Sequence, residues 1–114
     1  MKTAIVGSRC ATAADYGLIG ENLPPGTTEI ISGGAQGVDQ LARRYALEHG
    51  LPLREFFPDY RQFGKIAPIL RNNTIVQQAD FVLCLWDGRS PGTQNVISLC
   101  LKLGKPLRVV PLNR

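Results

Sequence analysis

The sequence predicts a protein of the α/β class with a mainly parallel sheet of about five strands. Two observations lead to this class. Short apolar runs alternate with segments of helical pattern along the 114-residue chain, and this alternation is typical of parallel sheets that carry helices on both faces. In addition, polar loops that contain glycine follow several of the apolar runs, at the places where such chains turn from a strand into a helix.

The expected strands are continuous apolar runs, which are typical of strands buried on both faces. The strongest are "TAIVG" near the N-terminus and "DFVLCLW" in the second half of the chain, whereas "LPLREFF" has the weakest pattern. We expect the strands at residues 3–7, 29–32, 51–57, 80–86 and 106–112.

The expected helices lie between these strands, at residues 15–23, 38–49, 68–79 and 94–104. Gly50 stands where the C-terminal cap of the second helix belongs, and Pro68 opens the third as its first residue. The apolar stripe of the second helix consists of Val38, Leu41, Ala42, Tyr45 and Ala46. Residues 58–67 are expected to be loop. Right-handed crossovers make the whole a Rossmann-like three-layer α/β/α sandwich, and the length suits one domain over residues 1–114.

The composition excludes several classes of protein. Hydrophobic residues make up 44% of the chain, enough for a folded core, and no apolar run approaches the ~20 residues of a membrane span. The three cysteines are widely spaced and His49 is the only histidine, so we expect neither a disulfide framework nor a metal site. We expect a cytoplasmic protein with no membrane partner and no resident cofactor. The net charge of +4 suits an anionic ligand but is too small to imply nucleic acid by itself.

Three glycine-containing loops follow expected strands and therefore lie at one rim of the sheet, where α/β proteins bind ligands. They are "GSR", "SGGAQG" and "DGRSPGT". The second and third each lead into a helix, whose free amides and positive dipole favour an anion. The candidate ligand-binding residues in and near these loops are Gly7, Ser8, Arg9, Ser32, Gly33, Gly34, Ala35, Gly37, Asp39, Arg71, Asn72, Asp87, Ser90, Gly92 and Thr93.

The alternative for each loop is that its glycines only turn the chain tightly between a strand and a helix. Neither standard phosphate motif is present. No Lys-Ser/Thr pair closes a P-loop, and the dinucleotide fingerprint belongs after the first strand, where this chain has only "GSR". Three loops together at one rim favour a ligand that carries phosphate.

Two charged positions have more than one interpretation. Asp39, in the first turn of the second helix, either complements the helix dipole or contacts a ribose or an amine. Arg71 stands beside Asn72 inside an apolar helical pattern, where an arginine needs a partner. It either reaches a phosphate at the rim or pairs with a carboxylate such as Asp80 or Asp87.

Other side chains carry weaker hypotheses. Trp86 ends the fourth strand, next to the third loop, and either stacks on a base or caps the core. Phe56, Phe57 and Tyr60 lie where an adenine could sit, although we favour the core or a subunit interface for them. Cys10 stands near a helix start, but no base accompanies it, so a nucleophilic role is not expected.

Four segments in this order, "GSR", "SGGAQGVDQLA", "APILRNNTIVQQAD" and "DGRSPGT", resemble the SLOG superfamily, which groups the cytokinin-activating LOG proteins with DNA-processing protein A. The similarity covers nearly the whole chain and is greatest to the small stand-alone YspA-like branch. It implies a Rossmann-like fold that binds nucleotides or nucleotide-derived molecules. It also implies homo-oligomers, as does the apolar pattern of "VISLCLKLG", although a central place for that helix in the fold would explain the pattern equally well.

One departure from the LOG pattern bears on activity. The LOG enzymes cleave the N-glycosidic bond of a nucleoside monophosphate, and a Glu in their motif GGxGTxxE assists the chemistry; this chain has Val96 at that position. We therefore expect a binding module that senses or sequesters its ligand. One alternative is a nucleoside 5′-monophosphate N-glycosidase, with Asp39, Arg71 or Asp87 as catalytic candidates. Another is single-stranded nucleic-acid binding, against which the modest charge and few aromatic residues count.

Overall fold

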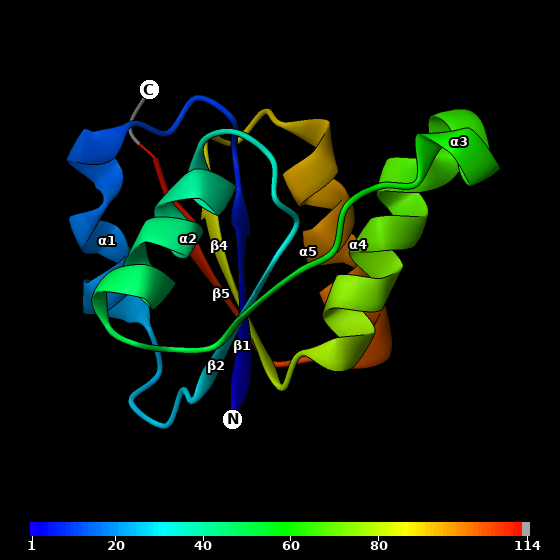
Figure 1. The fold of residues 1–114 in the computed structure, drawn as a ribbon. Coiled ribbons are helices and arrows are strands. Elements are labelled where there is room, and N and C mark those ends of the chain that lie inside the picture. The colour runs from blue at the N-terminus through cyan, green and yellow to red at the C-terminus, as the bar shows by residue number, and fades with distance from the viewer. Residues whose placement is uncertain (113–114) are drawn as a thin grey trace.

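A single parallel sheet forms the centre of the computed structural model, which describes residues 1–112 (Figure 1). All its pairings are parallel, and the strand order is β3-β2-β1-β4-β5. The strands are β1 (Lys2–Gly7), β2 (Glu29–Ser32), β3 (Leu53–Glu55), β4 (Phe81–Trp86) and β5 (Leu107–Pro111). The five parallel strands confirm the fold class expected from the sequence.

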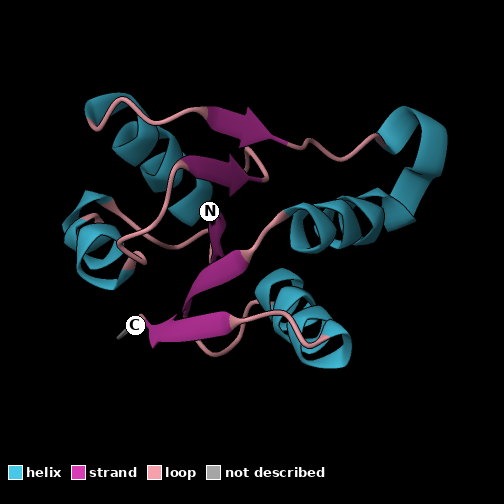
Figure 2. Ribbon diagram, turned by 90° about the horizontal axis from the view of Figure 1, so that it is seen from below, coloured by secondary structure: helices cyan, strands magenta, loops and turns pink. Residues whose placement is uncertain are grey.

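Helices cover both faces of this sheet, which confirms the three-layer arrangement (Figures 1 and 2). α1 and α2 lie on one face, whereas α4 and α5 lie side by side on the other. α3 lies beyond the start of α4, away from the sheet. The helices are α1 (Gly17–Asn22), α2 (Val38–Glu48), α3 (Tyr60–Phe63), α4 (Ala67–Gln78) and α5 (Pro91–Leu103).

The two central strands are apolar over most of their length, β1 from Ala4 onward and β4 throughout, because both of their faces are covered. In β1, Ala4 and Val6 pack toward α4 and α5, while Ile5 packs toward α1 and α2. β4 alternates in the same way, with Cys84 on the first side and Leu83 on the second. All these side chains are buried, so the sheet separates two hydrophobic cores.

Several boundaries differ from those expected. The segment 58–67 is not a plain loop: α3 forms there, since the Asp59 carboxylate accepts the Gln62 amide at 3.1 Å as an N-terminal cap, and a 3₁₀ turn, Gly64–Ile66, follows. α4 begins one residue before Pro68. The expected helix 15–23 is divided into a 3₁₀ turn, Ala13–Asp15, and the shorter α1. α5 begins at Pro91, so the end of the third glycine loop is its first turn.

The strand order places a topological switch point between β1 and β4. The chain leaves β1 toward one face of the sheet and leaves β4 toward the other, so their loops diverge and leave a crevice at the carboxyl ends of the strands. Separately, no helix within residues 1–112 is both long and apolar enough to cross a membrane.

Gly7 is required where β1 enters this crevice. A Cβ at this position would overlap the Leu85 carbonyl oxygen and the Val38 side chain. We expect Gly7→Ala to lower the free energy of unfolding by about 1–3 kcal/mol or more, because the strand and the helix would have to move apart. Chemical denaturation measures this. Gly26→Ala is the matched control, since nothing lies within 4 Å of a Cβ there, and equal stability of the two variants would contradict the close packing.

Candidate functional site

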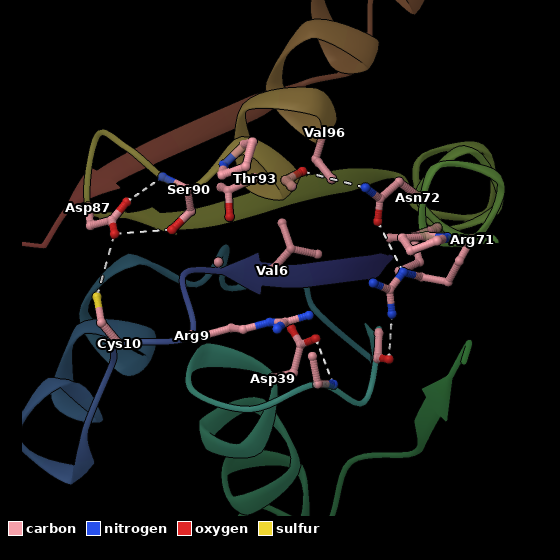
Figure 3. Close-up of a pocket in the computed structure, with 17 residues that line it drawn as sticks. Val6, Arg9, Cys10, Asp39, Arg71, Asn72, Asp87, Ser90, Thr93 and Val96 are labelled. Carbon is pink, nitrogen blue, oxygen red and sulfur yellow. Dashed lines mark hydrogen bonds between the residues drawn. The ribbon is translucent and has the colours of Figure 1, made fainter. Parts of the chain in front are cut away.

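A pocket of about 530 Å³ lies in the crevice between the ends of β1 and β4 (Figure 3). Four segments form it: the loops after β1, β2 and β4, and the first three turns of α4, with the start of α5 continuing the last loop. Val6 lies at the centre of the view, with Arg9 and Asp39 on one side and Thr93 and Val96 on the other. The lining residues are Val6, Gly7, Arg9, Cys10, Gly33, Ala35, Asp39, Pro68, Arg71, Asn72, Ile75, Asp87, Ser90, Pro91, Gly92, Thr93 and Val96.

Most of the candidate residues chosen from the sequence line this pocket, but Ser8, Ser32, Gly34 and Gly37 do not. Ser8 is buried and joins the loops: its amide donates to the Leu85 carbonyl at 3.0 Å, and its hydroxyl accepts the Asp87 amide at 3.0 Å. Ser32 is also buried, and its hydroxyl accepts the Gly34 amide at 3.4 Å. These residues hold the loops in shape behind the pocket wall.

The glycines of the second loop are needed for the conformation of the chain. Gly34 and Gly37 have φ of 70° and 75°, values that other residues rarely adopt. A Cβ would overlap the Phe57 ring at Gly34, and the Ser8 and Arg9 backbone at Gly37. The interpretation of these glycines as turn residues therefore accounts for them without a ligand.

Gly92 is different, because nothing in the protein lies within 4 Å of a Cβ placed there and its φ is not positive. It is the second residue of α5, whose N-terminal cap residue, Ser90, makes no side-chain capping bond. The Ser90 hydroxyl instead donates to the Asp87 carboxylate at 3.1 Å. The amides of Gly92 and Thr93 therefore have no partner within the helix or from its cap, and both residues line the pocket.

Asp87 organises the third loop. Its carboxylate accepts the amides of Arg89 and Ser90 at 2.9 and 2.8 Å, and the Cys10 thiol lies 3.7 Å away on the other oxygen. These hydrogen bonds, the Ser90 amide first, hold the pKa of the carboxyl well below its usual range. Asp87 is therefore an anion at neutral pH whose oxygens already accept hydrogen bonds, which makes it a poor general base.

Asp39 lies on the opposite wall and is only 6% exposed. Its Oδ2 accepts the Ala35 amide at 3.0 Å, whereas its buried Oδ1 has no hydrogen bond of normal geometry among the described residues. Burial raises the pKa of the carboxyl, although the Ala35 amide, Arg71 and the nearby Ser32 hydroxyl oppose the rise. The group can accept a further donor or hold a proton.

Arg71 and Asn72 connect the two walls. The pairing of Arg71 with Asp80 or Asp87, one of the two interpretations that the sequence left open, is wrong. The Arg71 Nη1 donates to the Gly33 carbonyl at 2.7 Å and its Nε to the Asn72 amide oxygen at 3.1 Å. The Asn72 Nδ2 in turn donates to Asn95 Oδ1 at 3.0 Å and to the Gly92 carbonyl at 3.4 Å. Asp80 accepts the Lys2 amide instead. The hydrogen bonds run from the second loop to the start of α5 (Figure 3).

Sequence reasoning missed the apolar part of the pocket, formed by Val6, Pro68, Ile75 and Val96. Helical spacing was the available signal, because Val96 lies one turn after Thr93 and Ile75 one turn after Arg71. Trp86 does not line the pocket; its indole N–H donates to the Ser90 carbonyl at 3.1 Å. Among residues 1–112 no group of three metal-ligating side chains is placed to hold a metal ion.

Known proteins resemble this chain at two levels. The model of the YspA, cpYpsA-related SLOG family matches residues 4–63. The solved structure of DNA processing protein A from Helicobacter pylori, a protein described by its single-stranded DNA binding mode, superimposes with a TM-score of 0.74 at 24% identity. That likeness covers 99% of this chain but only 66% of the other, and at this identity it shows the fold alone. No curated protein matches the chain.

We expect substitution of the two pocket carboxylates, Asp39 and Asp87, to change the stability of the protein in opposite directions at neutral pH. Folding raises the pKa of Asp39. The stability that this shift contributes is therefore present below about pH 3.9, the ordinary pKa of aspartate, and is lost as the pH rises through the pKa of the folded protein. We expect Asp39→Asn, which keeps an acceptor for Ala35 but cannot ionise, to be more stable than the wild type by about 1 kcal/mol at pH 7, and the gain to vanish near pH 3.

Asp87→Asn is the matched comparison for this experiment. The pKa of Asp87 is lowered by folding, so its contribution is present at neutral pH and is lost as pH falls. Thermal denaturation at pH 7 should therefore show a loss for Asp87→Asn where Asp39→Asn shows a gain. A loss of stability at pH 7 in both variants would contradict the account of Asp39.

Proposed function

The chain belongs to the YspA, cpYpsA-related SLOG family, and from this premise we propose that it binds a nucleotide or a nucleotide-derived ligand in the pocket between β1 and β4. The ligand phosphate lies against the start of α5, and the protein acts as a sensing or sequestering module.

The observation that carries the proposal is the uncapped start of α5. Gly92 and Thr93 both line the pocket, and their adjacent amides have no partner from the helix or its cap; the helix dipole adds positive potential at the same point. Gly92 leaves open space where any other residue would place a side chain. Arg9, which is exposed and lines the pocket, adds a guanidinium.

The opposite wall suits a neutral polar group, such as a sugar hydroxyl. Asp39 there is a buried carboxyl with acceptor capacity to spare, and Arg71, already hydrogen-bonded to Gly33 and Asn72, fixes the geometry of the loop beside it. A buried acceptor that meets a ligand hydroxyl favours ligands that carry one.

Val96, one helical turn after Thr93, favours binding without cleavage. A glycosidase needs a carboxylate near the sugar to stabilise positive charge. Val96 is 2% exposed and lies in the apolar part of the pocket with Val6 and Ile75. Asp87 carries a negative charge but is a weak base, since its pKa is lowered, so it does not activate the attacking water.

The glycosidase alternative rests on Asp39 alone, whose raised pKa suits a general base. Incubation of the protein with nucleoside 5′-monophosphates, followed by chromatography, tests it. We expect no free base above the level of a protein-free control. Release of base that Asp39→Asn abolishes, in a variant that still binds the nucleotide, would establish the enzyme instead.

The proposal itself is tested by Gly92→Asp. A Cβ at the second position of α5 meets no atom within 4 Å, and an aspartate there favours the helix dipole, so the fold is expected to be as stable as the wild type. The same carboxylate would occupy the proposed phosphate position and repel a phosphate there. We expect the affinity for nucleoside 5′-monophosphates to fall by on the order of 10-fold or more, measured by isothermal titration calorimetry.

Gly88→Ala and Gly26→Asp are the control variants for Gly92→Asp. Gly88 has φ of 81° and open space around a Cβ, so its substitution reports strain in the same loop without a charge in the pocket. Gly26→Asp adds the same charge far from the pocket. Unchanged affinity in Gly92→Asp, or no affinity of the wild type for any nucleotide, would refute phosphate binding at α5.

A homo-oligomer stays a prediction, with the exposed Leu101 and Leu103 at the end of α5 as its support.

A further inference from the structure

A second, smaller cleft of about 140 Å³ adjoins the main pocket at Arg71. Residues of the segment that follows β3, of α3 and of α4 line it. Phe56, Phe57 and Phe63 supply its aromatic surface, and Leu70 supplies part of the apolar floor. Arg71 is the one residue that lines both the cleft and the main pocket among the described residues.

The aromatic side chains of this cleft are unusually exposed for a folded domain. Phe57 is 61% exposed and Phe63 is 41% exposed, and the neighbouring Tyr60 is 57% exposed. An exposed group of large apolar side chains beside a pocket marks a surface that binds something. In the same segment, Phe56 packs against the hydrophobic core on the side of α4 and α5. The exposure is therefore specific to Phe57 and its neighbours.

The charges in the cleft do not favour a second phosphate. The Arg71 Nη1 already donates to the carbonyls of Gly33 and Phe56 at 2.7 and 3.4 Å. Asp59 adds a negative charge at the rim, with its Oδ1 accepting the Gln62 amide. A flat, neutral, aromatic group that stacks on phenylalanine and on a guanidinium plane fits these surroundings best.

We propose that this cleft binds the nucleobase of the ligand, with Phe63 and Phe57 stacking on the base and Arg71 dividing the base from the phosphate. The inference rests on the proposed function, because it takes the phosphate to lie at the start of α5. The hydrogen bonds from the Gly92 carbonyl through Asn72 to Arg71 link the start of α5 to the wall of the cleft. Arg71 contributes to both sites, because it holds the second loop through the Gly33 carbonyl and forms part of the wall of the cleft.

The test compares a nucleotide with the same molecule lacking its base. Affinities of adenosine 5′-monophosphate and of ribose 5-phosphate are measured by calorimetry for the wild type and for Phe63→Ala. We expect Phe63→Ala to weaken the nucleotide by about 10-fold, in line with the loss of one stacking partner, and to leave ribose 5-phosphate unchanged. Phe63→Tyr keeps a ring and is expected to keep the nucleotide affinity.

Leu47→Ala is the matched control, since Leu47 is 76% exposed on α2, outside both the cleft and the pocket. Equal losses for both molecules in Phe63→Ala, or no loss for either, would overturn the base site while leaving phosphate binding intact. If neither molecule binds the wild type, the proposed function itself fails. A single-stranded oligonucleotide forms the third arm: affinity for it that depends on Phe63, without affinity for the mononucleotide, would assign the cleft to nucleic acid and overturn the mononucleotide proposal.

Discussion

The site depends on one chain of hydrogen bonds, from the Gly33 carbonyl through Arg71 and Asn72 to the start of α5. Arg71 is half-buried, and burial lowers the pKa of its guanidinium while Asp39 opposes the change. The acceptors that its Nη1 and Nε reach offset the loss of water around this half-buried cation. The same bonds fix the second glycine loop against α4 and orient the first turn of α5, so the two walls of the pocket keep one separation.

The glycines divide according to this arrangement. Those of the second loop allow the backbone to pass close to Phe57, Ser8 and Arg9, and they would be needed with or without a ligand. Gly92 has no such reason, and it lies beside the amides that have no partner. A glycine-rich stretch in a sequence thus contains residues kept for packing and residues kept for access, and only the surroundings of each Cβ separate the two.

The sequence was sufficient for the sheet because β1 and β4 are apolar on both faces, a pattern that few other structures produce. It was also sufficient to bring Arg9, Asp39, Gly92 and Thr93 to one rim, since parallel strands end on the same side. It was insufficient for the partner of Arg71, because the acceptor is a backbone carbonyl, which any residue provides. It also missed α3, since a four-residue helix capped by Asp59 leaves no periodic pattern.

The most direct test of the account observes the amides at the start of α5 themselves. Nuclear magnetic resonance of the ¹⁵N-labelled protein, titrated with adenosine 5′-monophosphate, reports each backbone amide separately. The account predicts that the largest downfield shifts belong to Gly92 and Thr93, because a charge-assisted hydrogen bond forms at each. Saturable binding that leaves these two amides unmoved, with its shifts elsewhere on the surface, would contradict it.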